Sequence, residues 1–591
     1  MFEKRNYCGE ISTSHIGKNV LLAGWVDVKR DLGGILFIEI RDVTGIVQVV
    51  VDSSQSPETA LIAEKVRSEY CVLVEGQVRK RTDETVNPAL TTGSIEVVVE
   101  RIAILNASLV PPFPIDSRDP VSEEMRLRYR FLDLRRDDMK DAIIKRHMLM
   151  QVARKYLTEN RFFEIETPIL NKSTPEGARD YIVPSRLSRG MFYALPQSPQ
   201  LFKQILMVSG FDRYFQIVKC FRDEDLRQDR QPEFTQIDIE MSFVTQDMVL
   251  QSIEGLLKEM VKAILGRDIA TPFQRITYDE SMRRYGKDAP DCRFGMEICD
   301  CSDIFSGSAF DIFSSALAQQ GVIKCFVVED EGKLSRKMLD DYTKYVQIYR
   351  AGGMPWVRVK NKSFEGGIAK FISDTERKAL IERLHPADNS VVIFACDRAD
   401  IVNDTLGNLR VKIARDLDIV DSEELNFVWI TDFPLLEYDD DDGRFYAKHH
   451  PFTSPVPEHV ELLDSVTREN VHAIRAQAYD IVLNGTEIGG GSIRIHHPDV
   501  QQKMFSILGI SEEEAQLKFS FLVEALKYGA PPHGGIALGL DRILMILLRR
   551  NSIRDVIPFP KTQKGQCLMS EAPSPVSSEQ LRELSIKILE R

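Results

Sequence analysis

The sequence predicts an α+β protein of several domains, with a small β-barrel at its N-terminus. Its 591 residues exceed what a single hydrophobic core usually organises. The first hundred residues consist of short β-branched runs separated by turn signals, as in an all-β domain. After a proline-rich stretch, amphipathic helical patterns alternate with strands, which indicates mixed α and β domains for the rest of the chain.

The composition excludes several classes of protein. With 43% hydrophobic and 28% charged residues, the chain is typical of ordinary globular proteins. The net charge of −13 disfavours non-specific coating of nucleic acid, so we expect no DNA partner, although a specific contact needs only a local basic face. No run of 18 apolar residues occurs and the first ten residues lack a signal-peptide core, so we expect a cytoplasmic protein with no membrane partner. The nine cysteines include no CxxC pair, which favours reduced thiols over a zinc site.

The barrel is predicted from five strands and one helix. The strands are Val20–Val28, Ile35–Asp42, Ile46–Asp52, Cys71–Val78 and Ile95–Leu105, and the helix is Thr59–Glu69. A helix after the third strand favours an OB-type barrel, a frequent binder of single-stranded nucleic acid. Aromatic and basic side chains suited to stacking bases and holding phosphates are Arg30, Phe37, Gln48, Arg79, Lys80 and Arg81. The alternative for Phe37 is that it fills the barrel.

The rest of the chain changes character at several points. Leu109–Pro120 is rich in proline and is predicted to be a linker. Lys140–Asn160 has apolar residues at helical spacing and leads into the strand Phe162–Glu166, which ends before Pro168. We expect domains at 1–108 (barrel), 109–139 (hinge), 140–288 and 416–565 (two parts of one domain), 289–415 (an insertion) and 566–591 (an extension).

One charged run indicates an anion-binding site. Phe221–Gln236 (FRDEDLRQDRQPEFTQ) places arginines and acids in a loop between two strands. Alone it could be a charged surface hairpin. A second arginine lies in Gly539–Arg542, at the start of a helix. Arginines from two segments suit a triphosphate, because the guanidinium fork pairs phosphate oxygens without losing its charge.

Two carboxylates complete this nucleotide site. Asp480 and Glu487 flank a turn, with a spacing suited to holding Mg²⁺ through one or two carboxylates plus phosphates. No GxxxxGK[ST] loop occurs, which disfavours a P-loop NTPase.

These segments resemble the three motifs of class II aminoacyl-tRNA synthetases, and nearly the whole chain resembles the bacterial type of aspartyl-tRNA synthetase. Motif 1 corresponds to Lys140–Pro168, motif 2 to Phe221–Met241 and motif 3 to Gly535–Leu548. The family's aspartate-specific blocks TPEG, QSPQLFKQ, HHPFT and GGGSIRIH are present at 174–177, 197–204, 449–453 and 489–496. The resemblance implies an OB-fold anticodon-binding domain and an antiparallel-sheet catalytic domain that carries a GAD-like α+β insertion.

The resemblance also implies roles for individual residues. Those expected at the aspartate substrate are Glu176, Gln200, Lys203, Arg222, His449, His450 and Arg494, with Lys203 and Arg494 on the side-chain carboxylate. Those expected at ATP are Arg222, Asp223, Glu224, Gln231, Phe234, Glu487, Gly539, Leu540, Asp541 and Arg542. Arg222 and Arg542 are the expected catalytic residues, and Asp480 and Glu487 the expected Mg²⁺ ligands. The alternative for each of the two neighbouring histidines is a purely structural role.

Further expectations concern tRNA and assembly. The residues expected at the anticodon are Arg30, Phe37, Gln48 and Glu96. In the family, the choice between tRNA-Asp and tRNA-Asn has been linked to two loops of the barrel, and here these loops contain Leu32 and Glu84. Motif 1 implies a homodimer, although its apolar face could equally be internal core.

The implied reaction activates L-aspartate with ATP and transfers it to the 3′ end of tRNA-Asp, with tRNA-Asn left open as a second acceptor. An asparaginyl- or lysyl-type enzyme is the nearest alternative, and the insertion and the pair of Lys203 and Arg494 argue against it. A second alternative is a non-catalytic tRNA-binding paralogue, which the intact Arg222, Glu487 and Arg542 disfavour. A third is a stand-alone enzyme that activates aspartate to make asparagine, which would not need the N-terminal barrel.

Overall fold

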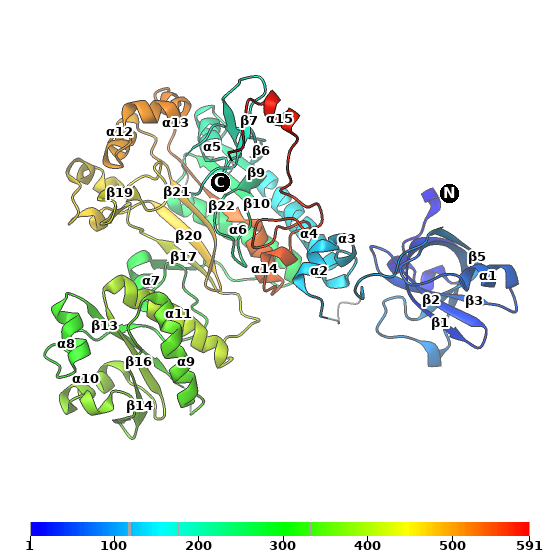
Figure 1. The fold of residues 1–591 in the computed structure, drawn as a ribbon, viewed down its shortest axis with the longest axis horizontal. Coiled ribbons are helices and arrows are strands. Elements are labelled where there is room, and N and C mark those ends of the chain that lie inside the picture. The colour runs from blue at the N-terminus through cyan, green and yellow to red at the C-terminus, as the bar shows by residue number, and fades with distance from the viewer. Residues whose placement is uncertain (1, 116–119, 175–176, 330–331, 590–591) are drawn as a thin grey trace. The chain divides into compact units, whose positions relative to one another are not determined.

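The computed structural model describes residues 2–115, 120–174, 177–329 and 332–589 (Figure 1). The chain forms two compact units. The first comprises the residues up to Ile144 together with Cys567–Ala572, and the second comprises Lys145–Gln566 together with Pro573–Arg591. Among the described residues, no helix is both long and apolar enough to cross a membrane.

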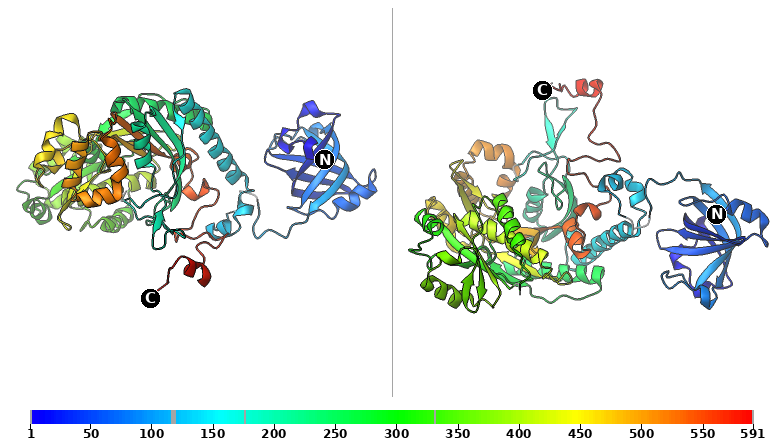
Figure 2. Two further views of the ribbon diagram at one scale, coloured as in Figure 1. Left: turned by 90° about the horizontal axis from the view of Figure 1, so that it is seen from above. Right: turned by 60° about the horizontal axis from the view of Figure 1, so that its bottom comes forward.

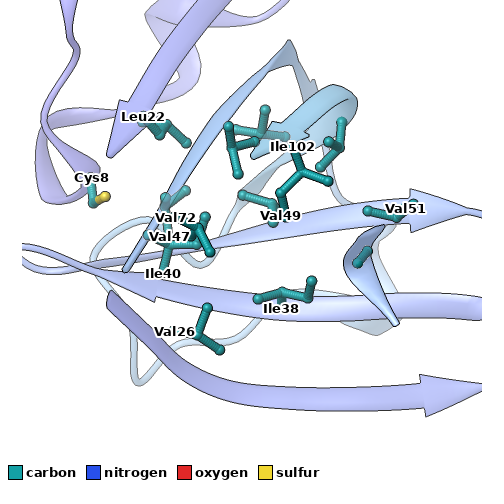
Figure 3. Close-up of a cluster of buried hydrophobic side chains, with 14 of the residues drawn as sticks. Cys8, Leu22, Val26, Ile38, Ile40, Val47, Val49, Val51, Val72 and Ile102 are labelled. Atoms are coloured by element: carbon teal, nitrogen blue, oxygen red, sulfur yellow. The ribbon is translucent and has the colours of Figure 1, made fainter. Parts of the chain in front are cut away.

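The first unit contains the predicted five-stranded barrel, which closes in the order β1-β2-β3-β5-β4. Its strands are β1 (Asn19–Leu32), β2 (Ile35–Arg41), β3 (Ile46–Asp52), β4 (Cys71–Lys80) and β5 (Ile95–Asn106). Side chains alternate along each strand, so one set fills the interior. Leu22, Ile38 and Val49 belong to this core and are fully buried (Figure 3).

The helix of the barrel is shorter than the sequence pattern predicts. α1 spans Pro57–Ala63, whereas the pattern predicts a helix over 59–69. Proline in the first turn favours the earlier start, because its fixed φ suits a helix and its missing N–H has no partner there. After Ala63 the chain turns toward β4, and Glu69 adopts a left-handed φ of 64°.

Helices follow the barrel in the first unit. They are α2 (Glu123–Arg128) and α3 (Arg130–Asp133), and α4 (Asp137–Glu159) spans the boundary between the units. α4 matches the predicted amphipathic helix. Arg135 donates to Glu69 at 2.7 Å and lies 4.8 Å from the ring centroid of Trp25, which fastens the segment before α4 to the barrel.

The second unit is built on an eight-stranded sheet of order β11-β17-β20-β21-β22-β10-β9-β6. The strands are β6 (Phe163–Glu164), β9 (Arg213–Phe221), β10 (Glu233–Ser242), β11 (Gln274–Thr277), β17 (Phe427–Thr431), β20 (Ala478–Leu483), β21 (Thr486–Ile493) and β22 (His533–Gly539). The central pairs are antiparallel, and only the outermost pairs, β11 with β17 and β6 with β9, are parallel.

Helices pack on this sheet, and α5 (Gln200–Val208) contributes polar residues to its other side. α6 (Gln246–Leu265) and α14 (Leu540–Leu547) contact β22 and β10. Because side chains alternate along β10, Ile237 and Ile239 face one side of the sheet and Asp238 and Glu240 the other. The remaining elements are α7 (Tyr278–Tyr285), α12 (Pro498–Ile507), α13 (Glu512–Leu526), α15 (Ser578–Glu583), β7 (Ile182–Pro184), β8 (Phe192–Ala194), β18 (Leu436–Asp439) and β19 (Arg444–Ala447).

The inserted region forms its own five-stranded sheet, of order β12-β13-β16-β14-β15. Its strands are β12 (Cys299–Asp300), β13 (Val322–Val328), β14 (Trp356–Lys360), β15 (Ser363–Glu365) and β16 (Val391–Asp397). Its helices are α8 (Asp311–Ala318), α9 (Arg336–Val346), α10 (Asp374–Leu384) and α11 (Ala399–Asp416). Two separate apolar clusters, one packed with α9 and α11 and one with α8 and α10, make the sheet buried on both sides.

The C-terminal helix lies against the second unit. α15 approaches the β7–β8 hairpin (Figures 1 and 2), and Arg186 of the hairpin pairs with Glu583 at 3.2 Å. Both side chains are largely exposed, so this ion pair contributes little stability.

Candidate active site

A cavity of about 620 Å³ lies over the central strands of the eight-stranded sheet. It draws on α5, β10, β20, β21 and the start of α14. Glycines of β21 keep its floor open. A Cβ on Gly490 would lie 2.5 Å from Asp480 Oδ1, and a Cβ on Gly491 would lie 2.1 Å from the Gly535 carbonyl oxygen. A larger residue at Gly490 would displace the Asp480 carboxylate, and one at Gly491 would collide with the backbone of β22.

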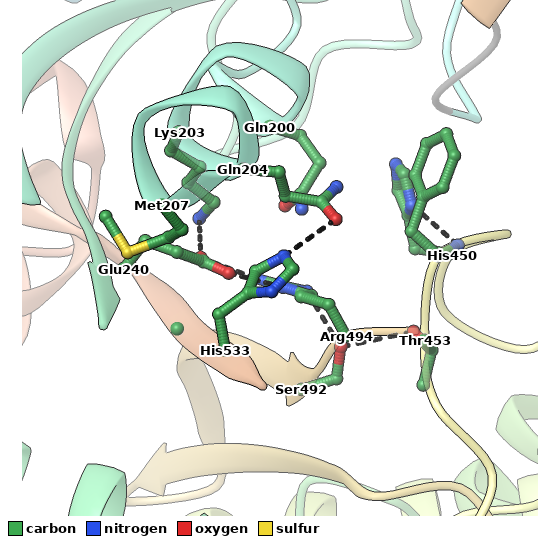
Figure 4. Close-up of polar contacts among 12 residues, drawn as sticks. Gln200, Lys203, Gln204, Met207, Glu240, His450, Thr453, Ser492, Arg494 and His533 are labelled. Carbon is green, nitrogen blue, oxygen red and sulfur yellow. Dashed lines mark hydrogen bonds and ion pairs between the residues drawn. The ribbon is translucent and has the colours of Figure 1, made fainter. Parts of the chain in front are cut away.

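Four charged side chains are buried together, and three of them, Lys203, Asp238 and Arg494, line the cavity. Figure 4 shows Lys203, Glu240 and Arg494. Lys203 Nζ lies 2.7 Å from Asp238 Oδ1 and 3.3 Å from Glu240 Oε2. Arg494 donates to both Glu240 oxygens, through Nε at 2.9 Å and Nη2 at 3.1 Å. Two cations therefore balance two carboxylates, which is the condition for keeping charge in a dry interior.

The two carboxyl groups of this cluster differ in acidity. Burial raises the pKa of Asp238, and Lys203 only partly offsets it. Burial also opposes ionisation of Glu240, but Arg494 and Lys203 outweigh it and lower the pKa of Glu240. Among the described residues, Asp238 Oδ2 has no hydrogen-bond partner although it is buried. This oxygen is an unused acceptor in the wall of the cavity.

Three histidines surround the cluster. Burial lowers the pKa of His450 to about 3, with Arg494 adding to the effect, so His450 is neutral. Its Nδ1 accepts from the Phe452 backbone N–H at 3.3 Å. His533 donates Nδ1–H to the Pro531 carbonyl oxygen at 2.7 Å, and its Nε2 lies 3.2 Å from the Gln204 amide. His449 Nε2 lies 3.6 Å from Asp480 Oδ1.

Arg222 lines the cavity. Its guanidinium carbon is 5.1 Å from the ring centroid of Phe234, across the β9–β10 hairpin. Arg222 Nε is buried, and no described group accepts its proton. Gln231 exchanges hydrogen bonds with the Lys561 backbone, at 2.7 and 3.0 Å, which fixes the loop that carries Glu224.

Arg542 enters from the opposite side. It donates to the Glu487 carbonyl oxygen at 2.5 Å and to Asp229 Oδ2 at 3.2 Å. Asp541 points away from solvent, where it pairs with Arg146 and accepts from the Thr235 backbone N–H at 2.7 Å. One of its oxygens thus binds α14 to β10 and the other binds α14 to α4.

Asp480 and Glu487 converge above Gly490. A Cβ on Gly490 would lie 3.6 Å from Glu487 Oε1 as well as 2.5 Å from Asp480 Oδ1. Reduced hydration of the carboxyl and the charge of Asp480 raise the pKa of Glu487 to about 7. A divalent cation would relieve this repulsion, and carboxylate oxygens suit Mg²⁺. The described residues hold no group of three or more His, Cys, Asp or Glu side chains able to bind a metal, so phosphate oxygens would have to complete the coordination.

The structure brings most of the predicted residues to this one cavity. Those that line it are Gln200, Lys203, Arg222, Glu224, Gln231, Phe234, His449, His450, Asp480, Glu487, Arg494, Gly539, Asp541 and Arg542. Asp223 and Leu540 are not among its lining residues. Leu540 is fully buried and Asp223 bonds through its backbone N–H to the Arg179 carbonyl oxygen. Glu176 lies outside the described residues.

Sequence reasoning missed the anionic half of the buried cluster. Asp238 and Glu240 belong to the segment Thr235–Ser242, where acids alternate with isoleucines in a strand that is buried throughout. Acids alternating with isoleucine and methionine over Asp238–Met241 were the available signal, because buried charges need partners.

A second candidate surface lies on the outer face of the barrel. Leu36, Ile38 and Ile40 point inward, so Phe37 points outward and is half-buried. Arg30 pairs with it across β1 and β2. Gln48 donates to Glu96 at 2.9 Å, so the predicted residues form one polar and aromatic face. Phe37 therefore does not fill the barrel.

Comparison with known proteins agrees with this geometry. A family model described as tRNA synthetases class II (D, K and N) matches residues 122–563, and one described as OB-fold nucleic acid binding domain matches residues 20–105. The chain is 51% identical to an aspartate–tRNA(Asp/Asn) ligase of Aquifex aeolicus, over 100% of this chain and 99% of the relative. It is 50% identical to an aspartate–tRNA ligase of Macrococcus caseolyticus, again over 100% and 99%.

Solved structures show the same fold at lower identity. An asparaginyl-tRNA synthetase from Pyrococcus horikoshii, complexed with asparaginyl-adenylate, covers 94% of this chain and 98% of its own length, with a TM-score of 0.58 and 20% identity. The enzyme from Entamoeba histolytica gives a TM-score of 0.57 with 17% identity, over 94% of this chain and 98% of its own.

Proposed function

The chain belongs to the class II tRNA synthetases of the D, K and N group, and from that membership we propose that its site activates L-aspartate with ATP and transfers it to tRNA. The full-length relatives at about half identity are aspartate–tRNA ligases, and no asparaginyl or lysyl enzyme is needed to explain the match. The observation that carries the substrate assignment is the buried pair of Lys203 and Arg494 at the end of the cavity.

This pair suits the side-chain carboxylate of aspartate. Asp238 and Glu240 already engage Lys203 twice, which leaves one of its three N–H donors for a ligand. Glu240 and Ser492 likewise use only part of the Arg494 fork. Asparagine would present an amide N–H₂ to these donors and leave buried cationic N–H groups unpaired, a penalty large enough for strong rejection.

The α-amino and α-carboxylate groups of the amino acid are placed by polar atoms of the cavity lining that have no partner among the described residues. Gln200 Nε2 is buried without an acceptor in the described part of the chain, and Asp238 Oδ2 without a donor. The α-ammonium group of an amino acid can donate to the free acceptor, and its α-carboxylate can accept from the free donor. We therefore place the α-amino group near Asp238 Oδ2 and the α-carboxylate toward Arg222.

Adenylation then needs positioning more than acid–base chemistry. The ionised α-carboxylate is itself the nucleophile that attacks the α-phosphorus of ATP, and pyrophosphate leaves. Arg222, between the two halves of the cavity, is set to bind the carboxylate and the α-phosphate together, where negative charge builds up. Phe234 offers a face for adenine, and Arg542 a cation for the terminal phosphate. Asp480 and Glu487 would hold Mg²⁺, which supplies charge neutralisation on the phosphates.

The acceptor is tRNA. A ribose hydroxyl at its 3′ end receives the aspartyl group. tRNA-Asp is the proposed acceptor, and tRNA-Asn is a second candidate because relatives from Aquifex aeolicus and Geobacillus sp. (strain WCH70) carry both acceptors in their names. Leu32 and Glu84, the residues tied to this choice, are both exposed on the barrel. Charging separate tRNA-Asp and tRNA-Asn transcripts decides between one acceptor and two.

Two further parts of the proposal concern the setting of the enzyme. None of the nine cysteines, all of which the structure describes, forms a disulfide, which suits the reducing cytoplasm. A homodimer is proposed because β6, at the edge of the sheet, exposes Phe163, and Phe211 packs against it with ring centroids 6.4 Å apart.

The experiment that tests the reaction is aspartate-dependent exchange of pyrophosphate into ATP. Arg222→Ala should lower the exchange rate at least about 10²-fold, roughly 3 kcal/mol of transition-state stabilisation. Arg275→Ala is the matched control, because Arg275 is an exposed β11 arginine outside the cavity. Near-normal exchange by Arg222→Ala, or exchange that depends on asparagine or lysine instead, would refute the assignment.

A further inference from the structure

The turn between β20 and β21 is fixed by the chain segments that lead into and out of the inserted domain. Asn484 and Gly485 form this turn with left-handed φ values of 52° and 75°, as in the tightest hairpins. The two strands that it joins carry Asp480 and Glu487. A displacement of the turn would therefore move both carboxylates of the nucleotide site.

The entry segment packs directly on Gly485. A Cβ on Gly485 would lie 2.7 Å from the Cβ of Asp291, so any other residue there would push the segment away. Arg293 grips the Asp291 carboxylate with Nε at 2.9 Å and Nη2 at 2.7 Å. Asp288, three residues earlier, lines the active-site cavity. The entry segment thus reaches from the inserted domain to the wall of the site.

The exit segment holds Asn484. The Asn484 side chain accepts from the Asn426 backbone N–H at 2.8 Å and donates to the Glu424 carbonyl oxygen at 2.9 Å. Arg293 also donates to the Asp421 carbonyl oxygen at 3.3 Å, which joins the entry and exit segments. Turn, entry and exit form one hydrogen-bonded assembly.

One residue of the inserted domain secures this assembly. Arg410, in α11, is 1% exposed. Its guanidinium donates to the carbonyl oxygens of Asp291, Phe294, Gly295 and Met296 at 3.0 to 3.3 Å. The same group lies 4.4 Å from the ring centroid of Phe294 and 4.9 Å from that of Tyr285. The planar five-donor fork is required, since an ammonium group cannot reach four carbonyls in this geometry.

We propose that Arg410 is a positioning residue for the nucleotide half of the reaction: by holding the entry segment against the Asn484–Gly485 turn, it sets the places of Asp480 and Glu487. The inserted domain thereby determines the affinity for ATP and its cation without touching either. This inference deepens the proposed function and rests on it. Lys203 and Arg494, which serve aspartate, lie outside the assembly.

The test is calorimetric binding of ATP with Mg²⁺, measured without aspartate, and of aspartate alone. Arg410→Lys should raise the Kd for ATP with Mg²⁺ about 10-fold, the size of effect seen when the support of a metal ligand is removed. The Kd for aspartate should change less than about twofold. Arg383→Lys is the matched control, because Arg383 forks onto Asp303 on the exposed surface of the same inserted domain. It should change neither constant.

Equal weakening of both ligands by Arg410→Lys, or an unchanged Kd for ATP, would overturn the proposal. If Arg410→Lys does not fold, Gly485→Ala disturbs the same contact from the other side and decides the matter by the same two constants. Wild-type protein that shows no aspartate-dependent exchange would instead contradict the proposed function. Active wild-type protein with unchanged ATP binding in the variants would contradict this inference alone.

Discussion

At the scale of single residues, the proposed aspartate pocket depends on a buried group of two cations and two carboxyl groups. Arg494 has a rigid role in this group, because its Nε and Nη2 engage both oxygens of Glu240 while Nη1 donates to Ser492 at 2.7 Å. These bonds fix the orientation of the guanidinium, and therefore also the direction of its remaining N–H donors. Lys203 contributes charge from α5, without such a fork.

The arrangement predicts that Arg494→Lys is not a conservative substitution. It keeps the charge but loses the fork, so the KM for aspartate should rise about 10²-fold, roughly 3 kcal/mol, while the KM for ATP changes less than about threefold. Exchange kinetics with each substrate varied in turn measure both. Arg475→Lys, which alters an exposed fork onto Asp279, should leave both values near wild type. A rise confined to ATP would contradict the assignment of Arg494.

His450 predicts a dependence of stability on pH. Its pKa is about 3 in the folded chain because burial disfavours the charged ring, whereas the pKa of an unfolded histidine is about 6.5. Below that value the unfolded chain binds the proton and the folded chain does not, so stability falls as the pH drops from about 6.5 toward 3. The slope from this group is about 1.4 kcal/mol per pH unit.

His450→Gln should remove this contribution. Melting temperatures measured between pH 7.5 and 4.5 should fall less steeply for the variant than for wild type. His472→Gln serves as the control, because the neighbourhood of His472 is not part of the cavity. If the melting temperatures of wild type and His450→Gln fall equally steeply with decreasing pH, His450 is not held neutral.

At the scale of secondary-structure elements, the positions of the strands were more predictable than the contacts of their side chains. The barrel strands and α4 follow from local patterns, since alternation and helical spacing are written in consecutive residues. The end of α1 at Ala63 was not predicted, because the apolar spacing continues to Glu69 while the backbone turns to reach β4. The need for the chain to turn toward β4 arises from the tertiary fold and cannot be predicted from the local sequence.

The site shows the same division. Arginines and glycines in recognisable runs pointed to Arg222, Arg494 and Arg542, whereas Asp238 and Glu240 became visible only as partners of Lys203 and Arg494. Partners of a buried charge come from residues 35 and 254 positions away along the chain. The alternation of acids in β10 shows that these residues are unusual, but a single sequence does not show which cations they pair with.

The outer face of the barrel predicts a defect confined to the tRNA step. Phe37 is half-buried on this face beside the bonded pair of Gln48 and Glu96. Stacking of a base on an aromatic ring contributes about 1–3 kcal/mol, so Phe37→Ala should raise the KM for tRNA by about 10-fold or more. Aspartate-dependent exchange, which needs no tRNA, should stay at the wild-type rate. Phe2→Ala removes another exposed aromatic ring of the same unit and should affect neither.

At the scale of the whole molecule, the two proposed steps are assigned to different surfaces. Every described lining residue of the cavity proposed for adenylation belongs to the second unit. The barrel that matches the OB-fold nucleic acid binding domain, and that is proposed to recognise tRNA, belongs to the first unit. The two activities should therefore respond to separate sets of substitutions, and the proposed role of Arg410 groups the inserted domain with the first step.

Assembly of two copies is the remaining property argued at this scale. Phe163 is 59% exposed on β6, and Phe211 is 41% exposed beside it, at an edge of the eight-stranded sheet where a β-strand has unpaired backbone groups. Burying two such rings in a second copy would stabilise a dimer by removing apolar surface from water. Light scattering should therefore give wild-type protein twice the chain mass of 67.3 kDa.

A double substitution, Phe163→Asp with Phe211→Asp, places charge at this edge and should shift the mass to that of one chain. Leu517→Asp introduces one such charge at another exposed apolar position, on α13, and should leave the dimer intact. If the doubly substituted chain remains a dimer, the interface lies elsewhere and the exposed face of β6 has another use. If wild type is already a monomer, the similarity of α4 and β6 to motif 1 reflects internal packing alone.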